Sequence, residues 1–190
     1  MADNQVFVCY VIAVTEPGGV PPYVRSWPPN IEVASIEGVV VASLAGQAQP
    51  LTMVGRLVNG IVGGLAGGLL FGILMQAIGM IPMVAMLVGS KSVVVGWLVH
   101  LAISSFIGAS FAVLFGSRAT QIVPAALFGL GYGVVWWVLG GLLIMPARLG
   151  MGVFTFNTMA WLSLLGHLVY GLALGIVFAL LSRRGRGESG

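Results

Sequence analysis

Charged residues are scarce in this chain, and the apolar stretches between them exclude an ordinary soluble protein. Only 7% of the 190 residues are charged, whereas soluble domains average about 25%. Between Arg56 and Arg183 the only charged side chains are Lys91, Arg118 and Arg148. A soluble helical protein of this size would need charged outer faces. The composition therefore indicates a polytopic membrane protein, in keeping with the mean hydropathy of +1.06.

Reactive residue types are missing as well. Cys9 is the only cysteine, which excludes an intrachain disulfide and a cysteine-rich metal site. No Asp, Glu or Cys lies in the apolar stretches, so the two histidines there lack the further ligands of a strong zinc or copper site. An activated nucleophile, a carboxylate pair and a phosphate-cradling loop are also absent. We therefore expect neither catalysis nor a bound metal.

The few charges divide the region into four apolar blocks, each long enough for the roughly 20 residues that cross a bilayer. We predict an all-α membrane domain over residues 53–183, with spans near 57–80, 93–115, 121–145 and 159–181. Five arginines fall on one side of these spans, namely Arg56, Arg118, Arg183, Arg184 and Arg186, and Lys91 and Arg148 fall on the other. The positive-inside rule then places both termini in the cytoplasm of a plasma (inner) membrane protein.

The basic residues have a simple explanation in this topology. The pI of about 9.5 reflects the topology and contact with lipid headgroups, because no basic residues cluster among aromatics on a soluble face. We expect no nucleic-acid partner. Residues 184–190 read as a basic cytoplasmic tail.

Residues 1–52 differ from the rest, because they carry four acidic residues against one arginine, Arg25. The apolar run Val6–Val14 is too short to span a membrane and lacks a preceding basic region, so it is not a signal peptide. Five prolines between Pro17 and Pro29 indicate an extended linker. Residues 31–45 fit either a short strand pair or an amphipathic helix. We expect a Pro-rich extension that is poorly ordered or loosely packed.

Both histidines lie within predicted spans, on rows of small residues at four-residue spacing. The rows are Gly96, His100, Ser104, Gly108, Ala112 and Gly116, and Ser163, His167, Gly171, Gly175 and Ala179. Residues at this spacing share one helix face. Small residues mark close helix approach in lipid, and an ionisable group there points at protein. We therefore expect both imidazoles inside the bundle.

The membrane domain also looks like two copies of a helix pair. Each histidine is followed by a leucine and, eight positions later, by a glycine, Gly108 or Gly175. Spans one and three each carry two glycines on one row, Gly64 and Gly68 in one and Gly129 and Gly133 in the other. We predict two tandem two-helix repeats, related by an axis along the membrane normal, with both histidines at similar depth.

A glycine row in the first span has two interpretations. It comprises Gly60, Gly64, Gly68 and Gly72 and is continued by Gln76. Such a row lets backbones touch, either inside the four-helix bundle or at an interface with another subunit. Both interpretations remain open.

Three roles are open for His100 and His167. They can be neutral imidazoles bonded across helices to Ser104, Ser163, Gln76 or a backbone carbonyl, which would form the polar interior of the bundle. They can be axial ligands of a haem or chlorin, beside Trp136 and Trp137, which lie too deep for an interfacial belt. They can also line a proton or ion path.

The longest connection between spans, residues 146–158, falls on the outer side, where it can cover the histidines. Asn157 or Thr158 fits the N-cap of the fourth span. Arg148 in the same connection fits contact with lipid headgroups.

The segment Gly96-Trp97-Leu-Val-His100-Leu-Ala-Ile-Ser104, taken with Gly166-His167-Leu168-Val169-Tyr170, resembles the YagU-like inner-membrane proteins of bacteria. In that family a histidine-bearing span precedes a final Gly-His-Leu-Val-aromatic span. The resemblance covers roughly residues 93–182 and implies an integral plasma-membrane protein without an agreed biochemical activity. This chain departs from the family in its N-terminal segment and in its short connection between spans one and two.

The function predicted from the sequence is non-catalytic. We expect a helix-packing or interaction subunit that acts as a homo-oligomer or within a larger membrane complex, in contact with lipids. The first alternative is a haem- or chlorin-binding protein with His100 and His167 as axial ligands. The second is a small transporter or proton-responsive channel-like element.

Overall fold

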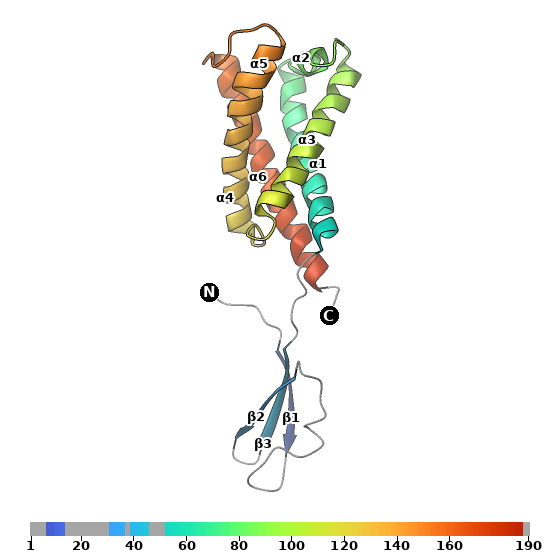
Figure 1. Cartoon of the computed structure of the whole chain (residues 1–190), viewed down its shortest axis with the longest axis vertical. Helices are drawn as coiled ribbons and strands as arrows, with labels where there is room; N and C mark the ends of the chain where they lie inside the picture. Colours follow the sequence, from blue (N-terminus) through green and yellow to red (C-terminus); the bar gives the residue numbers. More distant parts are fainter. Residues whose placement is uncertain (1–6, 14–30, 37–38, 46–51, 188–190) are drawn as a thin grey trace. The chain divides into compact units, whose positions relative to one another are not determined.

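The computed structural model describes residues 7–13, 31–36, 39–45 and 52–187. They belong to two separate units, a small β-sheet and a helical bundle (Figure 1). The predicted Pro-rich linker and the end of the basic tail, residues 188–190, lie outside the described residues.

The sheet has three antiparallel strands, β1 (Phe7–Ala13), β2 (Ile31–Ile36) and β3 (Val39–Ala45), in the order β1-β3-β2. Phe7 pairs with Ala45, and Ile31 pairs with Leu44. All three segments are rich in β-branched residues, which favour strands. Of the two alternatives for residues 31–45, the structure has the strand pair. The all-α prediction therefore holds for the bundle and not for this unit.

Four helical segments are long and apolar enough to cross a membrane. They are α1 (Met53–Ala77), α3 (Val93–Phe115), the run of α4 (Ile122–Trp136), η2 (Trp137–Ile144) and α5 (Met145–Arg148), and α6 (Thr158–Gly187). These segments confirm the four predicted spans. A short helix, α2 (Ile81–Met86), was not predicted. It lies with α5 at one end of the bundle, and the α3–α4 connection lies at the other end (Figure 1).

Local capping sets where the helices begin and end. The Thr52 hydroxyl accepts a hydrogen bond from the backbone N–H of Gly55, which starts α1. After α1 the chain turns at Gly79, whose φ of +72° favours glycine. Asn157 accepts a hydrogen bond from the backbone N–H of Ala160 at 2.9 Å. This confirms the prediction of an N-cap for the fourth span.

Helices α1 and α3 pack through glycine at backbone contact. A Cβ atom at Gly64 would collide with the carbonyl oxygen of Ser104 and with Gly108, and one at Gly60 would collide with the carbonyl of Gly108. A Cβ at Gly72 would collide with the indole of Trp97. The glycine row of the first span is thus used within the bundle, which is the first of its two interpretations.

Helices α4 and α6 meet in the same manner. A Cβ at Gly129 would collide with the carbonyl of Gly171, one at Gly133 with the carbonyl of His167, and one at Gly175 with that of Ala125. The two rows of small residues both face the inside, as predicted. Every member of the row from Gly96 to Gly116 is buried, and in the second row only His167 is half-buried.

Candidate functional site: a cavity between the helix pairs

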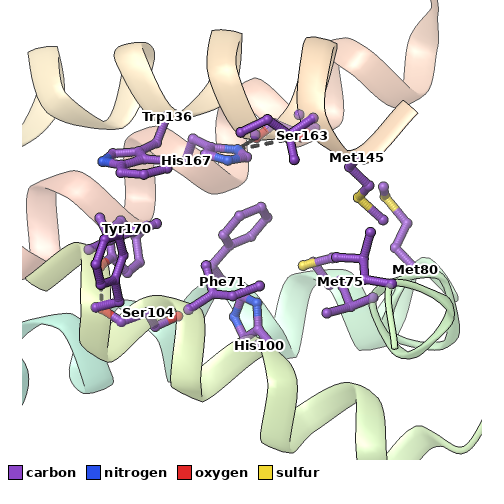
Figure 2. A pocket seen from close by; sticks show the side chains of 18 residues that line it. Phe71, Met75, Met80, His100, Ser104, Trp136, Met145, Ser163, His167 and Tyr170 are labelled. Carbon is purple, nitrogen blue, oxygen red and sulfur yellow. Dashed lines mark hydrogen bonds between the residues drawn. The ribbon is translucent and has the colours of Figure 1, made fainter. Parts of the chain in front are cut away.

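A cavity of about 410 Å³ lies between the α1–α3 pair and the α4–α6 pair (Figure 2). Its size falls within the range of small-molecule sites, roughly 300–1,000 Å³. Most of the residues that line it are apolar. The exceptions with polar side-chain atoms are His100, Ser104, Trp136, Ser163, His167 and Tyr170. The structure therefore brings both histidines and both serines of the predicted polar interior to one space.

Phe71 lies between the two imidazoles. Its ring centroid is 5.6 Å from that of His100, edge to face, and 4.8 Å from that of His167. Figure 2 shows the phenyl ring projecting from α1 into the space between them. Both histidines therefore contact one shared ring, and their similar depth in the membrane stays a prediction.

The hydrogen bond of His100 crosses between helices. Its Nε2 lies 2.8 Å from the carbonyl oxygen of Gly68 on α1. Because a carbonyl only accepts, the neutral ring carries its proton on Nε2 and leaves Nδ1 with a lone pair. This matches the first of the three roles predicted for the histidines.

The hydrogen bond of His167 stays within α6. Its Nδ1 lies 2.8 Å from the carbonyl oxygen of Ser163, one turn earlier, and 3.4 Å from the Ser163 hydroxyl. The carbonyl fixes the proton of the neutral ring on Nδ1, so Nε2 keeps a lone pair. No hydrogen bond from the described part of the chain reaches this Nε2. His167, a residue of the cavity wall, thus carries an electron-pair donor, its Nε2 atom. The hydrogen bond at Nδ1 fixes the tautomer of the ring.

Tyr170 closes one side of the cavity. Its hydroxyl donates a hydrogen bond to the carbonyl oxygen of Ser104 at 2.8 Å, which ties α6 to α3. Nearby, Trp136 lines the cavity, and its buried indole N–H has no hydrogen-bond partner among the residues that the structure describes.

Two predicted site residues lie elsewhere. Trp137 is absent from the cavity wall: its Nε1 donates to the carbonyl oxygen of Ala160 at 3.0 Å, and its ring packs near Trp161. Gln76 is exposed, so its assignment to the polar interior was wrong. The reason is local, since Gln76 lies in the last turn of α1, where its Oε1 accepts a hydrogen bond from Nε1 of Trp97.

The arrangement does not fit a haem or chlorin held between two axial histidines. A macrocycle with both imidazoles as axial ligands needs the space between the rings. The Phe71 side chain occupies that space. In addition, Nε2 of His100 is engaged by the Gly68 carbonyl.

A second cavity, also of about 410 Å³, lies at the end of the bundle that carries α2 and α5. It shares four wall residues with the first cavity, namely Met80, Gly141, Met145 and Ser163. Methionine is prominent in both walls, and the sequence prediction overlooked it. The available signal was the gathering of methionines in residues 75–86 and 145–159, around the outer ends of spans one and three.

A π-helical segment forms part of the cavity wall. Gly140, Gly141 and Ile144 belong to η2 and line the first cavity. A side chain at Gly140 would meet open space. π-Helical turns in spanning helices are frequent at functional sites, because the extra residue per turn displaces the local backbone. Here the displaced stretch borders both cavities.

No protein-family model, curated protein or solved structure matches this chain. The resemblance to the YagU-like proteins therefore stays a prediction.

Proposed function

We propose that this polytopic membrane protein binds a small solute in the cavity between its two helix pairs and admits it from the end that carries α2 and α5. The observation that carries the proposal is the pair of cavities, one at that end and one beside the two imidazoles, which have four wall residues in common. The proposal is closest to the transporter alternative among the functions that the sequence left open.

The charges suggest which side of the membrane the entrance faces. Lys91 and Arg148 flank the end of the bundle with α2 and α5, whereas Arg56, Arg118 and Arg183 lie at the opposite end. By the positive-inside rule the opposite end is cytoplasmic. In a plasma membrane the entrance then opens to the outside, and both termini lie in the cytoplasm.

A tandem repeat would account for the position of the cavity. Gly64 packs on the Ser104 carbonyl, four residues after His100, and Gly129 packs on the Gly171 carbonyl, four residues after His167. These equivalent contacts support two helix pairs of common origin. In many transporters the substrate site lies between such repeats, where two rigid bodies can move relative to each other.

A role as an interaction subunit has less support. The glycine row from Gly60 to Gly72, which could have formed an interface between subunits, packs against α3. Homo-oligomerisation and assembly with other membrane subunits stay predictions.

Cysteine labelling tests the proposal. Cys9 is the only cysteine, so a Cys9→Ser chain provides an unreactive background. Ser163→Cys places a thiol in the wall of both cavities. Ser182→Cys is the matched control, because Ser182 is on the same helix, is fully buried and lies near the opposite end of that helix from Ser163. The reagent is methanethiosulfonate ethylammonium, added outside intact cells.

We expect Ser163→Cys to react at least about tenfold faster than Ser182→Cys, because thiol reactivity follows access. Gly141→Leu should slow the labelling, because Gly141 borders both cavities and a Cβ atom there lies 3.1 Å from the hydroxyl oxygen of Ser163. Gly131→Leu should not, because Gly131 is exposed, meets open space and is absent from the cavity wall. Equal rates at Ser163→Cys and Ser182→Cys would contradict the proposal.

A further inference from the structure

We infer that the solute is a soft monovalent metal ion, copper(I), held by methionine thioethers where the two cavities meet. This inference rests on the proposed function, because it names the class of solute for that site. It concerns the methionines, whose thioethers bind soft metal ions although they are neither carboxylate, imidazole nor thiolate groups.

Six of the nine methionines line the two cavities. Met80 and Met145 border both cavities, and Met75 borders the first. The second cavity adds Met83, Met151 and Met159. These side chains come from both halves of the bundle. In Figure 2 the thioethers of Met75, Met80 and Met145 gather at one end of the cavity, beside Ser163.

The exposed fraction of these methionines decreases from the loop end of the bundle inward. Met151 and Met159 are 51% and 50% exposed, whereas Met75 is 4% exposed. Met80 and Met145 have intermediate exposure. Successive thioethers of similar strength would allow an ion to pass from one ligand set to the next without leaving sulfur coordination.

The chemistry of the walls selects a soft ion. Thioether sulfur favours copper(I), whereas carboxylate and carbonyl oxygens favour magnesium, calcium and manganese. Among the described residues there is no group of three or more His, Cys, Asp or Glu side chains that could hold a metal ion. Neutral ligands also suit a monovalent ion in an apolar setting, because burying a charge costs more as the charge grows.

His167 supplies a donor at the inner end. Its Nδ1–H is held by the Ser163 carbonyl, and its Nε2 keeps a lone pair. A metal-binding histidine almost always donates its other ring N–H to a carbonyl, a carboxylate or water, which fixes the orientation of the ring. His167 lines the same cavity as Met75, Met80 and Met145. It is therefore placed to receive the ion.

Packing alone does not explain the methionines. Methionine often fills irregular gaps in a core, but each of these six side chains borders the open volume of a cavity, and Met80 and Met145 border both cavities. Met86, which lies on α2 as Met83 does, is 43% exposed and lines neither cavity. It provides a matched control.

The test uses the full chain in lipid nanodiscs, with copper(I) titrated against the chelator bicinchoninate. Leucine preserves most of the volume of methionine and removes the sulfur. We expect a triple variant with Met75→Leu, Met80→Leu and Met145→Leu to bind copper(I) at least about tenfold more weakly. Met86→Leu should bind like the parent protein. An unchanged affinity in the triple variant would overturn the inference.

A spectroscopic measurement covers the case in which the triple variant fails to fold. In selenomethionine-labelled protein, X-ray absorption at the copper edge should reveal a copper–selenium shell. A bound copper without selenium neighbours would overturn the inference. If copper has no selenium neighbours but Ser163→Cys still reacts with the reagent from outside, the proposed solute site is supported and only copper(I) as the solute is contradicted. If Ser163→Cys is also unreactive, the proposed function falls with it.

Discussion

The Nε2 atom of His100 donates a hydrogen bond to the carbonyl oxygen of Gly68, 2.8 Å away, and so ties α3 to α1. His167, the other histidine in the bundle, bonds instead to a carbonyl of its own helix. The two histidines occupy matching sequence rows and line one cavity, but only one of them crosslinks two helices. Their substitution should therefore have different consequences.

His100→Ala should destabilise the bundle more than His167→Ala does. An interhelical hydrogen bond in lipid contributes about 1–2 kcal/mol in model peptides, and only His100 makes one. Unfolding in a mixed-micelle titration measures the difference. Copper(I) affinity should show the opposite order, with the larger loss in His167→Ala. Equal losses of stability and equal losses of copper(I) affinity in the two variants would contradict the hydrogen-bond partners and tautomers assigned to His100 and His167.

Gly64→Ala should destabilise the α1–α3 contact. Its methyl group would collide with the carbonyl oxygen of Ser104, a backbone atom that cannot rotate away. Overpacking of this kind costs about 1–3 kcal/mol. The control is Gly131→Ala, where the methyl group meets open space and the helix gains up to about 1 kcal/mol from the better propensity of alanine. Unfolding measurements on both variants should give opposite signs.

Tyr170→Phe should weaken the link between α6 and α3. It removes a hydroxyl that donates to the carbonyl of Ser104 in a buried setting, which is worth about 1 kcal/mol. Because the acceptor is backbone, Ser104→Ala should leave this bond intact. The two substitutions should therefore have additive effects on the free energy of unfolding. A coupling well above about 0.5 kcal/mol would indicate that the Ser104 side chain contributes to the link.

Asn157→Ala should fray the start of α6. Its side chain satisfies the backbone N–H of Ala160, and loss of such a cap typically costs about 1 kcal/mol. Asn157→Asp and Asn157→Ser should restore most of the stability, because both side chains can accept the same bond. Hydrogen exchange at residues 158–161 gives the local readout. Unaltered exchange in Asn157→Ala would mean that other contacts hold this turn.

Several properties of the protein follow from the sequence alone. Lipid tolerates few charges, so the spacing of Lys91, Arg118 and Arg148 predicted the four spans that the structure has. Helical periodicity placed the small residues near His100 and His167 on one face each, and close packing in lipid turned those faces inward. Both results depend on the local periodicity of the residues and on the lipid surroundings, and both can be inferred from the amino-acid sequence.

Tertiary packing decided which side chains meet. Trp136 and Trp137 are neighbours in sequence, but only Trp136 lines the cavity, because Trp137 turns to the carbonyl of Ala160. Gln76 continues the glycine row and is nonetheless exposed, since α1 ends one residue later. The meeting of Met75 and Met145 in one cavity has the same origin. Contacts between helices that are far apart in sequence depend on how the helices pack against one another, and local sequence patterns do not predict that packing.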